Sequence, residues 1–441
     1  MIYEKGELLT EGKTKKIFGV VGNFGLVIVE HKNTITALDD PRRTKEFETK
    51  ARYSTATTCR VFELLRNAEI PVAFQEQISP TEFLALNCKM IKLEVVARRF
   101  AVGSYLKRNP QLKQPDGQPP YRFHRLVAEF FLKTTGGKFL HSTKGEILIE
   151  GLDPQKGEED PLIINPFEEK WQLFHSKKPA WDDTANLKRT VKDWQVIDKE
   201  DAHKKMEQME SILRKVFLVL EGAWNTLGLH LIDLKIEFGI DPNSGEVVVA
   251  DVIDNDSWRL KDQNWQELSK EAFRQGEELA EVEKKYGTVA KLMEQIRIPK
   301  QALVIWTGSD KDEPPKTPLC YGVDVVNVVL SGHKATKACL EKLKELMGNY
   351  PDGGVIVVKV GRSNGLGPIL ASHTTWPVIA IPATLKENPE DLWSSIRMPS
   401  SVPLLTVWPE ENAVLAALNI LSAKNPLLYA QTQEQIEALD I

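Results

Sequence analysis

The stretch HLIDLKIEFGIDPNSGEVVVADVIDNDSWR, from His230 to Arg259, decides how the first part of the chain folds. Apolar residues at positions 232 to 238 alternate with Asp233, Lys235 and Glu237, which is typical of a β-strand with one apolar and one charged face. Turn-forming residues at 241–245 separate this strand from a second apolar run. The stretch therefore predicts a β-hairpin with several charges on one face.

The register across the turn decides which charges meet. If Ile240 pairs with Glu246, Lys235 lies opposite Asp251, and directly opposed side chains share a face. That face then carries Asp233, Lys235, Glu237 and Asp251. Uncompensated charge among valines and isoleucines is costly, so a divalent cation with phosphate near the lysine would stabilise it. A solvated outer face of the hairpin is the alternative, and a bulge would separate the charges.

Composition restricts the class of protein. A length of 441 residues predicts two or three domains, and a net charge of -5 argues against a general nucleic-acid binder. No run of 18 apolar residues occurs, so we expect no membrane span. The N-terminus has no apolar signal region and the four cysteines are scattered, which predicts a cytoplasmic protein with reduced thiols. Without an HExxH pair, a zinc site is not expected.

Two basic segments suit anions. The opening EGKTK predicts Lys13 and Lys15 on one face of a strand, beside Gly12, where they could hold a polyphosphate, although the spacing of a Walker loop is absent. The segment ARRFAVGSYLKRNP, residues 97–110, brackets Gly103 and Ser104 with guanidinium and ammonium groups that suit a phosphate or carboxylate. Exposed strand lysines and a solvated basic loop are the respective alternatives.

The middle of the chain contains predicted helices and one long segment without a recognisable period. Residues 204–227 have the apolar period of a core helix that ends at Gly228, and residues 267–296 read as mainly helical, with Gly276 and Gly287 as possible breaks. Residues 111–197 show no long periodic segment, and only the sequence Asp-Pro-Leu-Ile at 160–163 stands out.

From Gln301 the pattern changes. Apolar runs at 302–306, 323–329, 354–360 and 377–381 alternate with helical segments, which indicates a parallel α/β sheet. The first three runs are followed by TGSDKD, SGHK and GRSNGLGP, and sites in such sheets lie at the carboxyl ends of strands. These loops suit a sugar-phosphate. His333, in SGHK, reads equally as catalytic or as structural.

The motifs resemble a known family. EGKTK, RRFAVGSYLKRNP, LIDLKIEFG and DVIDNDSWR resemble phosphoribosylaminoimidazole-succinocarboxamide synthase of purine biosynthesis, whereas SGHK, GRSNGLGP and WSSIRMP resemble class II phosphoribosylaminoimidazole carboxylase. Their order in one chain resembles the bifunctional animal enzymes.

For the first domain the resemblance implies an ATP-grasp-like fold that joins L-aspartate to the carboxylate of carboxyaminoimidazole ribonucleotide. ATP is cleaved to ADP and phosphate through an acyl phosphate, with Mg²⁺ and lysines neutralising the phosphoryl group. The implied ATP site is Gly12, Lys13, Lys15, Glu94 at the adenine side, Lys235, Glu237 and Asp251, the last three also catalytic and the last two metal-binding. The implied ribonucleotide site is Arg98, Gly103, Ser104, Asp256, Ser257, Arg259, Lys270 and Arg274.

For the second domain the resemblance implies addition of CO₂ to aminoimidazole ribonucleotide without biotin or ATP, and its product is the substrate of the first domain. His333 would be a proton shuttle and Lys334 a second catalytic residue. Substrate contacts would come from Ser309, Asp312, Arg362, Ser363 and Asn364. Such carboxylases form octamers, so we expect a homo-octamer assembled through this domain.

Four departures from the family pattern matter. Asn33 and Ser269 stand where aspartates are usual, and residues 134–190 are expanded. The segment KDEPPKTPLCYG, residues 311–322, replaces a helix, because its prolines exclude one. Pro314 and Pro315 also lack N–H donors for a substrate phosphate, so we expect an active carboxylase with weakened affinity for its ribonucleotide.

The predicted fold class is mixed α/β and α+β. An ATP-grasp-like synthase domain is expected at 1–262, a helical connector at 263–300, and a Rossmann-like carboxylase domain with a parallel sheet at 301–441. The predicted partners are small molecules, with neither nucleic acid nor membrane. Two other functions stay open: a synthetase whose second domain serves only assembly, and a non-catalytic scaffold that binds purine ribonucleotides.

Overall fold

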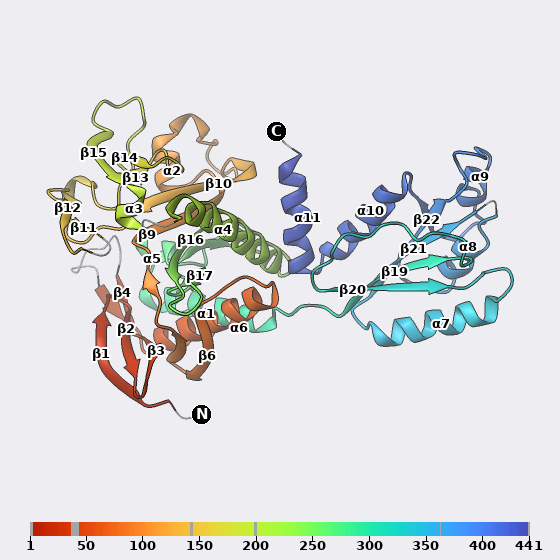
Figure 1. Cartoon of the computed structure of the whole chain (residues 1–441), viewed down its shortest axis with the longest axis horizontal. Helices are drawn as coiled ribbons and strands as arrows, with labels where there is room; N and C mark the ends of the chain where they lie inside the picture. The colour runs from red at the N-terminus through yellow and green to blue at the C-terminus, as the bar shows by residue number, and fades with distance from the viewer. Residues whose placement is uncertain (1–2, 37–43, 142–143, 198–200, 362, 440–441) are drawn as a thin grey trace. The chain divides into compact units, whose positions relative to one another are not determined.

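A computed structural model describes residues 3–36, 44–141, 144–197, 201–361 and 363–439. The chain divides into two compact units, the first ending at Ile296 and the second beginning at Arg297 (Figure 1). Within the described ranges, no helix combines the length and the apolar character that crossing a membrane requires.

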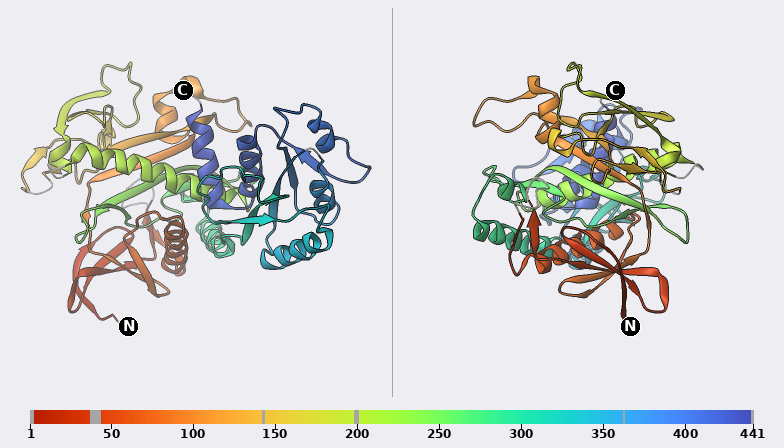
Figure 2. Two further views of the ribbon diagram at one scale, coloured as in Figure 1. Left: turned by 45° about the vertical axis from the view of Figure 1, so that its right-hand side comes forward. Right: turned by 90° about the vertical axis from the view of Figure 1, so that its left-hand side faces the viewer.

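The first unit contains a five-stranded antiparallel sheet near the N-terminus, drawn in red and orange in Figure 2. Helix α1 (Lys50–Asn67) packs against this sheet, and α6 (Leu279–Gln295) packs against α1. A two-stranded ladder pairs β4 (Thr34–Thr36) with β5 (Thr44–Glu46). The strand order of the five-stranded sheet is β1 (Lys5–Glu11), β2 (Lys15–Val20), β3 (Asn23–His31), β7 (Glu82–Leu86) and β6 (Phe74–Ser79).

A nine-stranded antiparallel sheet forms the rest of the first unit, and β16 (His230–Ile240) pairs with four of its strands. Helix α4 (Ala202–Asn225) covers this sheet with a fully buried apolar stripe. The strand order is β15 (Asn186–Lys192), β14 (Lys170–Phe174), β13 (Leu162–Ile163), β10 (Arg122–Leu132), β9 (Leu93–Phe100), β16 and β17 (Val247–Ala250), with β18 (Trp258–Lys261) and β8 (Lys89–Met90) also paired to β16.

Shorter elements decorate this sheet. They are α2 (Gly103–Arg108), the 3₁₀ turns Pro110–Leu112 and Pro154–Lys156, β11 (Phe139–Leu140), β12 (Ile147–Ile149), α3 (Asp193–Val196) and α5 (Glu271–Arg274).

The predicted hairpin exists, but its predicted register is wrong by one residue. Ile240 pairs with Val247 rather than Glu246, so Glu237 lies opposite Ala250. Strand β17 ends there, and Asp251 has a left-handed backbone with φ of +65°. Asp251 therefore leaves the ladder instead of lying opposite Lys235, because a left-handed residue turns the chain away from the strand direction.

Two predicted breaks near the end of the first unit have different outcomes. Gly276 has φ of +91° and follows α5, so the chain does break there. Gly287 lies inside α6, where the ring of Tyr53 would be 3.0 Å from an added Cβ. The missing side chain lets α1 and α6 approach each other, so this glycine serves packing.

The second unit is a five-stranded, fully parallel sheet, as predicted. Its order is β20 (Val323–Val329), β19 (Gln301–Thr307), β21 (Gly354–Val360), β22 (Val378–Pro382) and β23 (Leu404–Thr406). One face packs against α7 (Thr336–Asn349) and α8 (Leu366–Ala371), and the other against α10 (Glu410–Ser422) and α11 (Pro426–Ala438). A short helix α9 (Asp391–Ile396) precedes β23.

The proline-rich segment between β19 and β20 contains no helix, which confirms that prediction. Every residue of β19 is buried, as expected for a strand covered on both faces. Strand β20 lies at the end of the sheet order and leaves Val325 and Val329 exposed.

A buried ion pair joins α4 to the nine-stranded sheet and gives a test of the fold. Arg99 on β9 donates to both carboxylate oxygens of Glu221 at 2.7 and 2.8 Å, and both residues are buried. Arg99→Leu leaves the carboxylate buried without this partner, so we expect the free energy of unfolding of the first unit to fall by about 3–5 kcal/mol. Denaturant titration followed by tryptophan fluorescence measures it.

The double variant Arg99→Leu/Glu221→Leu removes both charges and should recover most of the lost stability, because apolar replacements of a buried pair are often neutral. Lys284→Gln, in an exposed pair on α6, is the control and should change the free energy by less than about 1 kcal/mol. A double variant as unstable as Arg99→Leu would contradict this account.

Candidate functional site

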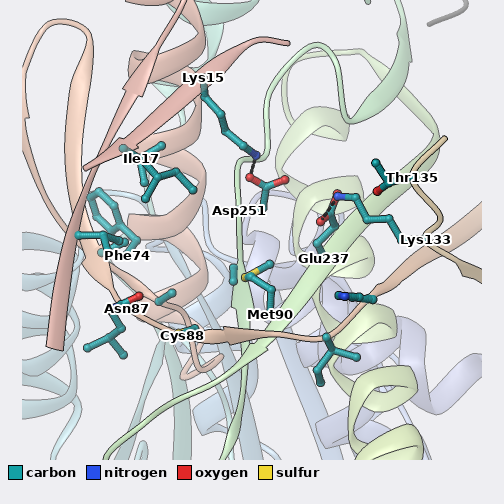
Figure 3. A pocket seen from close by; sticks show the side chains of 18 of the residues that line it. Lys15, Ile17, Phe74, Asn87, Cys88, Met90, Lys133, Thr135, Glu237 and Asp251 are labelled. Atoms are coloured by element: carbon teal, nitrogen blue, oxygen red, sulfur yellow. Dashed lines mark hydrogen bonds and ion pairs between the residues drawn. The ribbon is translucent and has the colours of Figure 1, made fainter. Parts of the chain in front are cut away.

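A cavity of about 340 Å³ lies in the first unit, lined by both of its sheets. Apolar side chains of β2, β3, β6 and β7, with the segment 86–92, form one part of its wall. Its charged lining residues are Lys15, Lys92, Lys133, Lys138, Glu237 and Asp251. Figure 3 shows Lys15 beside Asp251 and Lys133 beside Glu237. An apolar slot that ends in lysines and carboxylates suits a flat ring that carries a polyanion.

The charged part of this cavity holds an ion pair between Lys15 and Asp251 (Figure 3). Because Asp251 leaves strand β17, it reaches the same cavity as Glu237 by a different route from the predicted cross-strand pairing. Burial lowers the pKa of Lys15 to about 8, with the nearby ammonium groups adding to this and Glu237 opposing it.

Lys235 bridges a carboxylate of the neighbouring strand β9 and a carboxylate of its own strand β16. Its Nζ donates to Glu94 of β9 at 2.6 Å and to Glu237 at 3.3 Å. Burial alone would lower the pKa of Lys235, but the two carboxylates raise it above its ordinary value. Lys133 donates to both oxygens of Glu237 at 2.6 and 2.5 Å.

Glu237 is therefore surrounded by ammonium groups. Burial alone would raise its pKa, but Lys235, Lys133 and Lys15 outweigh burial and lower the pKa of Glu237 to about 2. The carboxylate is ionised at neutral pH and can accept a cation.

Glu94 lines a second cavity, of about 400 Å³. Its wall combines several cationic and anionic side chains with small polar groups. The lining residues are Glu94, Val96, Arg98, Ser104, Phe131, Pro154, Gly157, Glu159, Asp160, Ser176, Lys177 and Arg274. Since Lys235 contacts Glu94 on one side and Glu237 on the other, one ion-pair network joins the two cavities.

A row of buried ion pairs supports the second cavity. Arg98 donates to Glu129 at 2.6 Å, to Asp233 at 2.6 Å and to Ser104 at 3.0 Å. Arg259 donates to Asp233 at 2.5 Å and lies against Gly103, whose φ is +57°. Asp233 thus neutralises both guanidinium groups that the sequence assigns to a substrate anion.

The loop after Asp251 forms a buried polar cluster. Asp256 contacts Lys50 at 3.5 Å, Lys270 at 3.1 Å and the hydroxyl of Tyr286. Burial alone would raise the pKa of Asp256, but the two lysines lower it below its ordinary value. Ser257 donates to Val252 and accepts from the N–H of Asp254, so it fixes the loop itself.

The two departures from the usual aspartates have local explanations. Asn33 accepts a hydrogen bond from the N–H of Ala51 at 3.1 Å, at the start of α1. The hydroxyl of Ser269 accepts from the N–H of Glu271 at 3.3 Å, at the start of α5. Neutral oxygens thus satisfy the free N–H groups of both helix ends.

In the second unit, the loops after β19, β20 and β21 carry the predicted site residues. His333 is exposed, and its Nε2 would lie 2.2 Å from a Cβ added to Gly365. The ring therefore packs directly on the backbone of the third loop. Gly332 makes a similar approach, since its Cβ would lie 2.7 Å from the Cα of Leu366. Because Gly332 and Gly365 have no side chain, the second loop can pack closely against the third.

The other predicted residues of this unit have varied surroundings. Asn364 is buried, accepts from the N–H of Gly367 at 2.8 Å and donates to Ser395 of α9 at 3.1 Å, so it joins two helices. Ser309 begins a turn closed by the N–H of Asp312. Lys334 is exposed and follows His333, whereas Ser363 precedes Asn364. Arg362 lies outside the described residues.

One sequence expectation about the first cavity is wrong in its placement. Lys13 belongs to the turn between β1 and β2, beside Gly12, rather than to a strand face shared with Lys15. The error follows from a turn that the sequence pattern did not define. Glu94, which the resemblance assigns to the adenine side of ATP, lines the second cavity, and its role stays a prediction.

Sequence reasoning missed several residues of the two cavities. Lys133, Asp160 and Lys177 lie in the region without a recognisable period, and Lys50 was not separated from other lysines at the start of α1. For Asp160 the only signal was its unusual Asp-Pro-Leu-Ile context. Lys133 follows the long strand β10, which the sequence pattern did not reveal.

The two carboxylates of the first cavity could bind a metal ion only together with ligands from another molecule. Within the described ranges, no group of three or more histidine, cysteine, aspartate or glutamate side chains could hold a metal ion. Glu237 and Asp251 supply two carboxylates in one cavity. Mg²⁺ is usually bound by one or two carboxylates together with phosphates and water, so the pair fits a metal that arrives with a nucleotide.

The fold and the two sites define a nucleotide-binding ligase unit joined to a Rossmann-like unit with a site at its strand ends. Family models agree: "SAICAR synthetase" matches residues 8–152 and 165–293, and "AIR carboxylase" matches residues 303–440.

Relatives share both parts. The chain is 33% identical to the "Probable multifunctional protein ADE2" of Caenorhabditis elegans, over 98% of this chain and 95% of that protein. It is also 33% identical to the bifunctional phosphoribosylaminoimidazole carboxylase/phosphoribosylaminoimidazole succinocarboxamide synthetase of Rattus norvegicus, over 97% and 92%. A solved synthase from Ehrlichia chaffeensis is 21% identical with a TM-score of 0.48, over 66% of this chain and 100% of that one.

The chain therefore belongs to the family of bifunctional phosphoribosylaminoimidazole carboxylase/succinocarboxamide synthetases. This confirms the fold class and the bifunctional prediction, and it favours neither of the two alternative functions.

The lysines around Glu237 give a test of the charged part of the first cavity. A carboxyl whose pKa falls from 4.5 to about 2 on folding contributes stability above pH 4.5 that is lost as the pH falls toward 2. Glu237→Gln should therefore lower the free energy of unfolding by about 3 kcal/mol at pH 7. The difference from the unmodified protein should shrink below pH 4.

Chemical denaturation at pH 7 and pH 3.5 measures the two differences. Glu246→Gln, which changes an exposed carboxylate of the same hairpin, is the control and should be close to neutral at both pH values. A Glu237→Gln variant as stable as the unmodified protein at pH 7 would show that the lysines do not depend on this carboxylate.

Proposed function

We propose that the first cavity binds Mg-ATP and that the second binds the carboxylated ribonucleotide and L-aspartate. The observation that carries this proposal is the bridge from Glu237 through Lys235 to Glu94, which joins a nucleotide-sized cavity to one rich in arginine and lysine. A phosphoryl group at the first cavity and a carboxylate at the second would meet at Lys235, as an acyl phosphate requires.

In this proposal each charged group has a role. Lys15 and Lys235, with Gly12 and Lys13 in the turn before β2, hold the phosphates, and Glu237 and Asp251 bind the metal. Mg²⁺ would neutralise phosphate charge when bound. The chain's own lysines stabilise charge that develops on the transferred phosphoryl group. The ribonucleotide is held by Arg98, Gly103, Ser104, Asp256, Ser257, Arg259, Lys270 and Arg274.

Several of those ribonucleotide residues also form ion pairs within the protein. Arg98 and Arg259 share the carboxylate of Asp233, and Asp256 contacts Lys50 and Lys270. An anionic substrate would therefore compete with carboxylates of the protein for the guanidinium groups. Such a competition makes binding selective for a ligand that contacts several cations at once.

We also propose that the loops of the second unit carboxylate aminoimidazole ribonucleotide without biotin or ATP. His333 moves the proton at the ring carbon, Lys334 supplies positive charge, and Ser309, Asp312, Arg362, Ser363 and Asn364 form the phosphate and carboxylate contacts. The packing of His333 on Gly365 supports this assignment, because it fixes a histidine at the carboxyl ends of parallel strands. The proline-rich segment supports the weakened ribonucleotide affinity.

The remaining parts of the proposal concern the whole protein. We propose a cytoplasmic homo-octamer assembled through residues 301–441, and the exposed valines of β20 support an apolar contact there. Light scattering on the full chain measures its mass. The functional division at residues 262 and 300 stays a prediction, as does the absence of nucleic-acid and membrane partners.

The function is tested by product analysis. The protein is given aminoimidazole ribonucleotide and bicarbonate, with and without ATP and L-aspartate. We expect the carboxylated ribonucleotide in every mixture and the succinocarboxamide product only when ATP and aspartate are present. Asp251→Asn should abolish the ATP-dependent product and leave carboxylation unchanged, and unaltered ligation by this variant would disprove the metal assignment.

The contact between Gly365 and His333 gives a separate prediction for the second unit. In Gly365→Ala the new Cβ would collide with the imidazole, although φ of -80° permits alanine. We expect carboxylation to fall by about 100-fold or more, because a displaced proton donor loses its general acid–base contribution. The ligation of supplied carboxylated ribonucleotide should be unchanged.

Gly348→Ala is the matched control. Gly348 lies in α7, and an added Cβ there meets nothing within 4 Å. The variant should retain full carboxylation and gain a few tenths to about 1 kcal/mol of stability. Equal activity of the two variants would show that the position of His333 does not matter.

A further inference from the structure

Asp160 lines the second cavity and has an unusual backbone. It lies just before β13, and its φ of +49° places a non-glycine residue in the left-handed region. Such residues persist where the surrounding structure holds them and are concentrated at functional sites. Aspartate tolerates this conformation better than most residues, so the position combines a carboxylate with a fixed backbone.

Thr134 forms hydrogen bonds to only one oxygen of the Asp160 carboxylate. Its N–H and its hydroxyl both donate to Oδ1, at 2.7 and 3.2 Å, and the hydroxyl accepts from the N–H of Asp160 at 3.2 Å. Both bonds go to the same oxygen. The described residues supply no hydrogen-bond donor to Oδ2 in the structure, so this oxygen can accept a proton.

Asp160 differs from the paired carboxylates near the second cavity. Glu94 is paired with Lys235, Glu129 with Arg98 and Arg108, and Asp233 with Arg98 and Arg259. Among the described residues, Asp160 and its neighbour Glu159 line the cavity without an ion pair, and of these two only Asp160 is fixed by hydrogen bonds. A carboxylate already paired with a cation is a weak base, so Asp160 is the best-positioned base at this cavity.

The charges that face Asp160 fit the same role. Burial raises the pKa of Asp160 to about 6, Glu94 and Glu159 add to this, and Thr134 opposes it. Arg98, Lys177 and Arg274 line the cavity and can hold carboxylates of a ligand. Near neutral pH the group is ionised and yet more basic than an ordinary aspartate, which suits proton transfer.

We propose that Asp160 is the general base of the ligation step and accepts the proton of the incoming L-aspartate amine. This proposal rests on the proposed function of the first unit. The α-ammonium of L-aspartate gives one proton to Oδ2, and its nitrogen lone pair forms the C–N bond to the acyl phosphate carbon. The C–O bond to phosphate breaks, and phosphate leaves with that electron pair and takes the second proton from nitrogen, so that a neutral amide with one N–H remains. Asp160 then releases its proton to solvent.

The test separates nucleophile activation from acyl phosphate formation. The full chain is given carboxyaminoimidazole ribonucleotide and Mg-ATP, with either L-aspartate or hydroxylamine. Hydroxylamine is already neutral near pH 7, so it attacks an acyl phosphate without a base. Asp160→Asn keeps the size and the tolerance for a left-handed backbone. We expect the variant to lose about 100- to 10,000-fold in kcat with aspartate and to form hydroxamate at the unmodified rate.

The pH dependence gives a second measurement. With aspartate, kcat of the unmodified protein should fall as the pH drops through about 6, because a protonated carboxyl cannot accept a proton. The residual reaction of Asp160→Asn with aspartate should lack this fall near pH 6. Asp116→Asn, which changes an exposed carboxylate of the same unit, is the control and should match the unmodified protein in both reactions.

Each result has a defined meaning. Normal ligation by Asp160→Asn overturns the proposal, and so does a variant that only raises the KM for aspartate. Loss of both reactions in the variant also overturns it, since Asp160 would then serve acyl phosphate formation. An unmodified protein that forms neither product contradicts the proposed function itself.

Discussion

The first unit depends on charge neutralisation along one buried strand. Asp233, Lys235 and Glu237 project from alternate positions of β16, which pairs with four strands of the nine-stranded sheet. None of these charges could stay buried alone, because isolated ions in an apolar interior are very costly. Partners come from β9, from β18 and from the residue after β10, so the neutralising contacts also fix how these elements meet. Both cavities open along this row of ion pairs.

The second unit has little buried charge and depends on apolar packing instead. Its strands are apolar on both faces, and its candidate site depends on how closely three loops approach. Glycines at 332 and 365 permit backbone and imidazole contacts that any side chain would block. One chain therefore carries a site held by ion pairs and a site held by backbone packing, and the two should respond differently to salt.

Sequence patterns predicted what depends on period and composition. The parallel sheet of the second unit followed from apolar runs, and the helix over Ala202–Asn225 from its 3.6-residue period. The prediction for Asp251 had the wrong register, because the loop after Ile240 is one residue longer than assumed. The left-handed backbone of Asp251 also leaves no trace in an alternating pattern. Strand β10 was missed for a similar reason, since it is apolar on both faces over only part of its length. Cavity residues such as Lys133 and Asp160 come together only through long-range strand pairing.

The two contacts of Lys235 couple ligand binding at the first cavity to ligand binding at the second. Its single positive charge is shared between Glu94, at the second cavity, and Glu237, at the first. A cation that engages Glu237 releases part of this charge toward Glu94, and an anion at the second cavity draws it the same way. Ligands of opposite charge at the two cavities therefore favour each other's binding, and by reciprocity each raises the affinity of the other by the same factor. The coupling links a cation at the first cavity to an anionic ligand at the second, and it needs no movement of the backbone.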